Sequence, residues 1–260
     1  MSLPYEQYAG AIYDVDDTLL NNLPPDGDPF NLHERSRLAA IHGIARECGH
    51  AQLLSITAEE NRTFFENAPH HTVDAAVWAA LQSRGLAEGE LDLSHDILTA
   101  IVERKAALHM DLLLASGVEV AGASSFVRSL ECNGFSGRQA IASGARHDEI
   151  DAFLGKYGLA EIFPVARIIA RGDYTNPKPD PESFDTAYRT LGLPDTAGMR
   201  ASVLAFEDDP KGVVAALASG HTVGALTTRF EAEVFLDMPI KPHMIQRDFV
   251  EYADLLGLPL

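Results

Sequence analysis

Hydrophobic residues follow two different patterns along this chain. The run "GAIYDV" at residues 10–15 is short and apolar, which is typical of a strand buried on both faces. Between residues 31 and 116 the apolar residues recur at helical spacing, so we expect four helices and no strand there. After Gly117, short apolar runs alternate with helical patterns, which indicates a parallel, doubly wound sheet.

The middle of the chain carries clear helix boundaries. The first helix, within "NLHERSRLAAIHGIAREC", is predicted to end at Gly49. A second begins at "TAEENRTFFE", where Thr57 and Glu60 have the spacing of a capping box. Trp78 lies on the apolar face of the third, and we expect it to be a core residue.

The second half of the chain predicts further strands of the same sheet. These strands are expected at residues 138–143, 166–170, 202–207 and 221–226. The first strand therefore belongs to an α/β core, and a helical module is inserted directly after it. The linkers are expected at "NNLPPDGDP" (21–29) and "SGVEVAGA" (116–123). The predicted domains are an α/β core of residues 1–22 and 117–260, and a helical cap domain of residues 23–116.

Polar residues follow the predicted strands, at the edge where open parallel sheets bind ligands. They are Asp14 and Asp16, then Ser143 and Gly144, then Lys178 in "RGDYTNPKPDP", and then Glu207, Asp208 and Asp209. Acids from two strand ends repel each other unless a cation lies between them, and a site of oxygen ligands alone suits Mg²⁺. A hydroxyl and a lysine suit a phosphate group, and a carboxylate can attack phosphorus.

Composition narrows the range of functions. The net charge of −18 over 260 residues argues against non-specific nucleic-acid binding and against docking on anionic membranes. A small anionic substrate is compatible with it, because a metal or one lysine reverses the sign locally. The two cysteines, Cys48 and Cys132, lie far apart without metal-ligand spacing, and there is no apolar signal core or membrane-spanning run. We expect a cytoplasmic protein.

Four segments resemble, in order, the motifs of the haloacid dehalogenase (HAD) superfamily. They are "DVDDTL", "IASG", "NPKPDPESF" and "FEDDPKGVVAALASG". The resemblance covers nearly the whole chain and is to the phosphatase and beta-phosphoglucomutase-like branch, which has a helical cap after the first motif. It implies a Rossmann-like core and Mg²⁺-dependent hydrolysis of a small phosphate monoester through an aspartyl-phosphate.

The resemblance assigns a role to each motif. Asp14 falls on the family's nucleophile and Asp16 on its general acid and base. Ser143, with Gly144 beside it, and Lys178 fall on the phosphate-binding positions. Family members that cleave carbon–halogen bonds typically lack an acid at the Asp16 position, which speaks against dehalogenation.

The resemblance also implies the metal site and shows two departures from the family. The implied Mg²⁺ ligands are Asp14, the backbone carbonyl of Asp16, Asp208, and Glu207 acting directly or through water. Asp17 stands where many relatives have glycine, and Asp209 stands where small residues are frequent. Either extra charge could adjust the affinity for the metal.

The cap carries weaker candidates for substrate choice. His70 and His71 lie in the expected loop "ENAPHHTV", and Arg62 and Lys105 could meet a second anionic group. The competing interpretation is two solvated loop histidines and ordinary charges on helix surfaces.

Three alternatives remain open at this stage. A sugar phosphomutase is disfavoured because the cap loop reads "NAPHHT" rather than a Gly-x-Ser-Arg type segment. A phosphonatase would use a cap lysine, and residues 55–85 contain none. A non-catalytic binding protein would usually have lost a motif residue. The expected partner is a small phosphorylated metabolite, with a monomer or dimer as the assembly.

Overall fold

The computed structural model describes residues 4–23, 27–69 and 72–260. The chain forms two compact units, and the first consists of two separate segments of sequence. The core unit comprises Met1–Asn21 and Val118–Leu260, and the cap unit comprises Asn22–Gly117. The predictions that fall on His70 and His71 lie outside the described residues.

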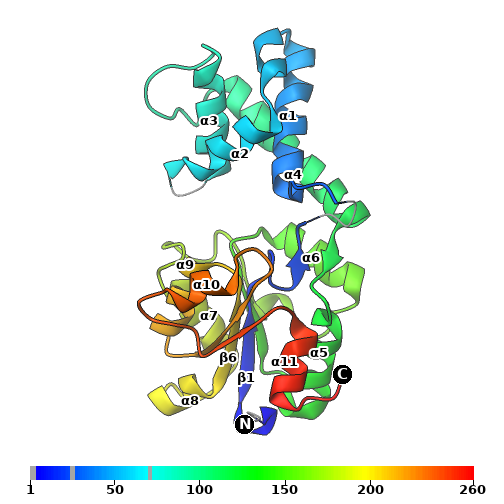
Figure 1. Cartoon of the computed structure of the whole chain (residues 1–260), viewed down its shortest axis with the longest axis vertical. Helices are drawn as coiled ribbons and strands as arrows, with labels where there is room; N and C mark the ends of the chain where they lie inside the picture. The colour runs from blue at the N-terminus through cyan, green and yellow to red at the C-terminus, as the bar shows by residue number, and fades with distance from the viewer. Residues whose placement is uncertain (1–3, 24–26, 70–71) are drawn as a thin grey trace. The chain divides into compact units, whose positions relative to one another are not determined.

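A six-stranded parallel sheet forms the centre of the core unit, with the strand order β5-β4-β1-β6-β7-β8. Figure 1 labels its two central strands, β1 and β6. The strands are β1 (Gly10–Tyr13), β4 (Gln139–Ala142), β5 (Ile168–Ile169), β6 (Val203–Glu207), β7 (Thr222–Leu226) and β8 (Met244–Gln246). Every pairing in this sheet is parallel, with β1 between β4 and β6. The predicted α/β doubly wound fold is confirmed.

Helices connect these strands in the alternating order that parallel pairing requires. The α-helices of the core unit are α5 (Ala123–Leu130), α6 (His147–Tyr157), α7 (Glu182–Thr190), α8 (Ala197–Ala201), α9 (Pro210–Ala218), α10 (Ala232–Leu236) and α11 (Phe249–Leu256). Shorter helical turns are η1 (Tyr5–Gln7), η4 (Glu131–Phe135) and η5 (Val165–Arg167).

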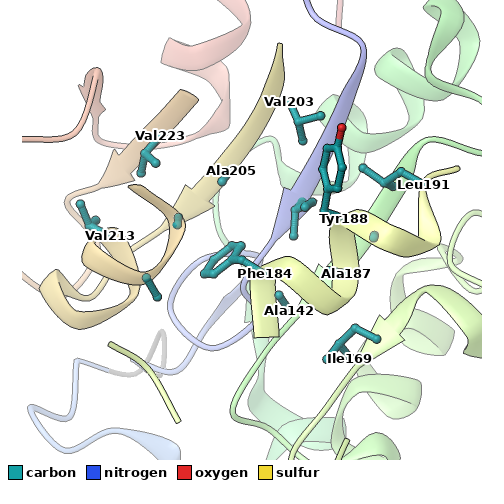
Figure 2. Packing of buried hydrophobic residues seen from close by; sticks show 14 of the residues in the cluster. Ala142, Ile169, Phe184, Ala187, Tyr188, Leu191, Val203, Ala205, Val213 and Val223 are labelled. Atoms are coloured by element: carbon teal, nitrogen blue, oxygen red, sulfur yellow. The ribbon is translucent and has the colours of Figure 1, made fainter. Parts of the chain in front are cut away.

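The sheet is buried on both faces, as its continuous apolar strands predict. All residues of β1, β4 and β6 are buried. Figure 2 shows one of the packed layers, where Phe184 and Tyr188 of α7 lie with Ala142, Ala205 and Val203 of the strands. This packing holds the carboxyl ends of β1, β4 and β6 in fixed register.

Several elements of the core unit differ from expectation. The strand β8 was not predicted, and the strand expected at 166–170 is reduced to Ile168–Ile169. The expected linkers contain a short antiparallel pair, β2 (Leu20–Asn21) with β3 (Val118–Glu119). Each of these two strands adjoins a point where the chain passes from one unit to the other.

The cap unit consists of helices, as predicted for residues 31–116. They are α1 (Leu32–Cys48), η2 (Ala51–Ser55), α2 (Ala58–Glu66), α3 (Val73–Ser83) and α4 (Asp96–Ser116). The capping box of Thr57 and Glu60 is present at the start of α2, and α1 begins with a second one made by Asn31 and Glu34. Trp78 is buried in the cap core, which confirms its prediction. Among the described helices, none is long and apolar enough to cross a membrane.

Candidate active site

Asp14 follows the end of β1 and lies in the interior of the core unit. It directly follows Tyr13, the last residue of the strand, and its backbone N–H donates to the carbonyl of Phe206 on β6 at 3.1 Å. The residue is almost fully buried, with 6% of its surface exposed. A carboxylate buried to this degree needs a cation or several donors close by.

Lys178 supplies that cation from the segment after β5. Its Nζ donates to Asp14 Oδ1 at 2.7 Å, to Glu207 Oε1 at 2.5 Å and to the carbonyl of Ala142 at 2.9 Å. The three acceptors come from the ends of β1, β6 and β4. One ammonium therefore joins three neighbouring strand ends, and the structure brings together Asp14, Lys178 and Glu207 as the motif order suggested.

The loop that carries Lys178 is held by Glu182, in the first turn of α7. Glu182 Oε1 accepts from the backbone N–H of Thr175 at 3.0 Å, and its Oε2 accepts from that of Asn176 at 2.8 Å. No role for Glu182 was predicted from the sequence. Its position four residues after Lys178 in "KPDPE" was the available signal.

Glu207 is turned against the start of α9, where only glycine leaves room for it. A Cβ on Gly212 would lie 2.0 Å from Glu207 Cδ, far inside van der Waals contact. Glu207 Oε2 also accepts from the backbone N–H of Asp208 at 3.2 Å. Position 212 must therefore be glycine, because any side chain there would overlap the Glu207 carboxylate. This role of Gly212 was not predicted from the sequence.

Asp208 completes a group of three buried acids. Oxygens of Asp14, Glu207 and Asp208 all lie within 4.8 Å of one another. Thr18, fully buried, donates its hydroxyl to Asp208 Oδ1 at 3.1 Å. Thr18 immediately follows the acids of the first motif, and this adjacency was the only sequence signal for it.

The charge of this group fits a divalent cation. Three buried carboxylates face one ammonium, which leaves two negative charges if all three are ionised. All the side-chain donors of the group are oxygens, the ligand type that Mg²⁺ prefers. The buried acidic group can therefore hold a metal ion such as Mg²⁺.

The pKa values of these groups reflect the same imbalance. Burial raises the pKa of Glu207 to about 7, although Lys178 opposes this shift. Burial also raises the pKa of Asp208 well above its ordinary value, and the charge of Asp17 adds to the rise. Burial lowers the pKa of Lys178, but the carboxylates of Asp14 and Glu207 outweigh it and raise that pKa above its ordinary range. A positive charge near Glu207 and Asp208 would therefore stabilise the ionised forms of these two acids.

Ser143 lies at the end of β4 beside the nucleophile candidate. Ser143 is fully buried, its backbone N–H donates to the carbonyl of Ile169 at 2.9 Å, and its hydroxyl accepts from the backbone N–H of Ala145 at 3.2 Å. Burial raises the pKa of Asp14, and the Ser143 hydroxyl partly opposes this rise. The hydroxyl of Tyr174 donates to the Ser143 carbonyl at 3.3 Å, and Arg171 Nε donates to the carbonyl of Gly144 at 3.0 Å. The segment after β5 therefore holds the Ser143–Gly144 turn.

Asp16 and Asp17 are both half-buried in the turn after β1. Asp16 forms a β-bridge with Leu20, which turns the chain back toward β2. Asp17 has φ 56°, the left-handed conformation that glycine adopts most easily. The Thr228 hydroxyl donates to the Asp17 carbonyl, so the loop after β7 helps to hold this conformation. A glycine would fit here without strain, which gives a physical reason for glycine at this position in relatives.

A hydrogen bond and an ion pair with nearby residues give Asp209 a structural role. Its Oδ1 accepts from the backbone N–H of Lys211 at 2.8 Å, so it is the N-cap of α9. Its Oδ2 forms an ion pair with Arg229 Nη1 at 3.0 Å. An effect of Asp17 or Asp209 on metal affinity stays a prediction.

The candidates in the cap unit have partners of their own. Arg62 Nε lies 2.6 Å from Glu34 Oε1, and its Nη2 donates to the carbonyl of Pro29 at 2.6 Å. Lys105 is buried rather than on a helix surface, and its Nζ lies 3.1 Å from His33 Nδ1. A role of Arg62 in substrate choice stays a prediction.

Comparison with known proteins agrees with the motif reading. A model of haloacid dehalogenase-like hydrolases matches residues 8–220. Validoxylamine A 7'-phosphate phosphatase of Streptomyces hygroscopicus subsp. limoneus is 26% identical over 233 residues, covering 90% of this chain and 92% of that protein.

Solved structures show the same fold. A HAD hydrolase of family IA, variant 3, from Entamoeba histolytica aligns with TM-score 0.70 and 19% identity, covering 95% of this chain and 99% of its own. CbbY from Rhodobacter sphaeroides, solved in complex with phosphate, aligns with TM-score 0.68 and 19% identity, covering 96% and 100%. Since the family model spans most of the sequence, this chain belongs to the haloacid dehalogenase-like hydrolases.

Proposed function

We propose that this protein is a Mg²⁺-dependent phosphatase that hydrolyses a small phosphate monoester through an aspartyl-phosphate. The observation that carries the proposal is the bridge from Lys178 to Asp14 and Glu207, at the carboxyl edge of a parallel sheet. It sets a nucleophile candidate beside a phosphate-binding cation and an acidic group able to hold a metal.

Asp14 is the nucleophile in this proposal. Its carboxylate attacks phosphorus, and the bond between phosphorus and the ester oxygen breaks as the aspartyl-phosphate forms. Asp16, two residues away, donates a proton to the departing oxygen so that it leaves as an alcohol. The half-buried position of Asp16 is compatible with proton exchange.

Ser143 and Lys178 bind the phosphoryl oxygens by hydrogen bonds and charge. Asp14, Asp208, Glu207 and the carbonyl of Asp16 would hold Mg²⁺. When bound, this ion would offset the charge of the acids and the phosphoryl oxygens. In the second step Asp16 takes a proton from water, which attacks phosphorus, releases inorganic phosphate and restores Asp14.

The relatives support a phosphorylated small molecule as substrate. One is a phosphatase of validoxylamine A 7'-phosphate, and CbbY was also solved with xylulose-1,5-bisphosphate. We propose a sugar-like phosphate ester as substrate class, and no nucleic acid or membrane as partner. A cytoplasmic location belongs to the same proposal.

The test is phosphate release from sugar monophosphates, sugar bisphosphates, nucleotides and small esters, with and without Mg²⁺. We expect Mg²⁺-dependent release by the wild type and a loss of at least about 10⁴-fold in Asp14→Asn. The matched control is Asp254→Asn, an exposed acid of α11, which should retain full activity.

Two results would overturn the proposal. Activity retained by Asp14→Asn, with deamidation excluded by mass spectrometry, would remove the nucleophile. Absence of release from every ester by folded, Mg²⁺-loaded wild type would point to a mutase, a phosphonatase or a binding protein instead.

A further inference from the structure

The cap unit contains a groove that the proposed chemistry does not use. Its volume is about 390 Å³, within the range of small-molecule sites, roughly 300–1,000 Å³. It runs along one face of α1, because Arg35, Leu38, Ala39, His42 and Arg46 all line it. These residues follow helical spacing, and the first and last lie about 16 Å apart along the axis.

The floor of the groove is apolar and fixed in place. Phe30, Leu38, Ala39 and Ala58 line it, the last from the first turn of α2. The guanidinium of Arg62 lies 4.5 Å from the centre of the Phe30 ring. This cation–π contact orients the ring, so the floor is preformed for an apolar ligand.

The two acids that line the groove are already engaged by the protein. Glu34 pairs with Arg62 and also accepts from the backbone N–H of Asn31 at 2.8 Å. Asp28 Oδ1 accepts from the backbone N–H of Phe30 at 2.9 Å, and its Oδ2 lies 3.8 Å from Arg35 Nε. Neither carboxylate presents an uncompensated charge to a ligand.

Arg46, in contrast, presents its charge at one end of the groove. It is exposed and makes no ion pair with any residue among 4–23, 27–69 and 72–260. His42 lies one turn away and directs its Nε2 toward the carbonyl of Ile56 at 3.0 Å. A carbonyl oxygen can only accept a hydrogen bond. In a neutral ring, Nε2 of His42 therefore carries the proton and Nδ1 carries none. The groove thus has an apolar floor and a cationic end, in a chain whose net charge is −18.

We propose that this groove binds a small organic anion, with its apolar body on Phe30, Leu38 and Ala39 and its anionic group at Arg46. Carboxylate, sulfonate and phosphate groups share the required chemistry. Because α1 and the first turn of α2 both line the groove, an occupant contacts both helices. Binding should therefore raise the thermal stability of the protein, by linkage.

The probe for this test is 8-anilinonaphthalene-1-sulfonate, whose fluorescence rises in apolar sites. Titration of the full-length protein should show one saturable site. Ala39→Trp, which fills the groove from an exposed position, should weaken binding at least about tenfold. Arg46→Gln should weaken it roughly fivefold, as expected for one exposed ion pair. The matched control is Arg104→Gln, on α4 and outside the groove, which should leave binding unchanged.

The neutral probe N-phenyl-1-naphthylamine separates the contribution of charge to binding from the contribution of apolar contact. It should bind the wild type and Arg46→Gln equally, and lose affinity only in Ala39→Trp. If Ala39→Trp does not fold, Leu38→Glu replaces it, since a negative charge on the floor repels the sulfonate. The proposal is wrong if no saturable site exists, or if groove variants bind the sulfonate as the wild type does.

Discussion

Charged side chains are buried at the carboxyl edge of the core sheet, whereas one ion pair of the cap unit lies at its surface. At the carboxyl edge of the core sheet, Asp14 and Glu207 are buried, and Lys178 reaches them from a distant segment. In the cap, Arg104 and Glu47 meet at the surface, with side chains 37% and 54% exposed. Removing one partner of a buried pair leaves an uncompensated charge, whereas water compensates an exposed one. These two groups of charges should therefore respond very differently to the removal of one partner.

The largest effect is expected from Lys178→Met. This variant keeps an unbranched side chain, one atom shorter, but leaves the buried acids without their ammonium. The free energy of unfolding, measured with urea at neutral pH without Mg²⁺, should fall by about 3–5 kcal/mol. Lys211→Met, on the exposed side of α9, is the control and should change it by less than about 0.5 kcal/mol. Equal losses of unfolding free energy in Lys178→Met and Lys211→Met would contradict the predicted difference between a buried and an exposed charge.

A pH titration tests whether burial alone, away from the active site, has similar consequences. Burial lowers the pKa of His221 from 6.5 to about 4, and the residue is 2% exposed. Between these values the unfolded chain binds a proton that the folded protein does not. The stabilisation from neutral His221 is therefore complete above pH 6.5 and is lost as the pH falls toward 4, about 3 kcal/mol in total.

His221→Gln removes this titration. The difference in unfolding free energy between wild type and variant should shrink or change sign from pH 7 to pH 4, because only the wild type loses the contribution. A constant difference across that range would contradict the assignment to His221.

Gly212→Ala tests the tight packing at the acidic edge. Its Cβ would lie 2.0 Å from Glu207 Cδ, so either α9 or the carboxylate must move. We expect a loss of about 1–3 kcal/mol in unfolding free energy. Gly155→Ala in α6 is the matched control, because nothing lies within 4 Å of its Cβ, and it should stabilise the protein slightly. Adding Glu207→Asp should recover part of the loss, since the shorter side chain withdraws from α9.

The smallest effect is expected in the cap, from Arg62→Met. Arg62 is 36% exposed at its side chain and pairs with Glu34, so the loss in unfolding free energy should be about 1 kcal/mol or less. Arg62→Met also tests whether Arg62 takes part in substrate choice. A KM raised several-fold with kcat retained would make Arg62 a binding residue, and an unchanged KM would leave it a structural residue of the cap.

The meeting of the polar groups at one edge of the core sheet was predictable because each of these groups follows an apolar run. A parallel sheet brings such run ends to one edge, which is why Asp14, Lys178 and Glu207 meet although they are far apart in sequence. The helices of the cap were predictable because their caps are local, as at Thr57 and Glu60.

The rest depends on contacts that no local pattern encodes. The strand β8 has three residues and borders charged and polar positions, so its hydrophobic signal is weak. The pair of β2 with β3 joins residues about a hundred positions apart, within segments rich in Pro and Gly. The fit of Gly212 to Glu207, and of Asp209 to Arg229, appears only when the loops are placed together.

The discontinuous core unit has a consequence for how the protein is made. Thr18 and Asp208, which are hydrogen-bonded in the folded protein, are 190 positions apart, and Lys178 is 164 positions from Asp14. The cap unit is a single continuous segment, so its contacts are available while the ribosome is still extending the chain. β1 leaves the ribosome first but gains its β6 partner only after residue 203 has emerged. The acids of the candidate active site therefore come together late in synthesis, and a chain truncated before β6 should make a folded cap without the buried acidic group.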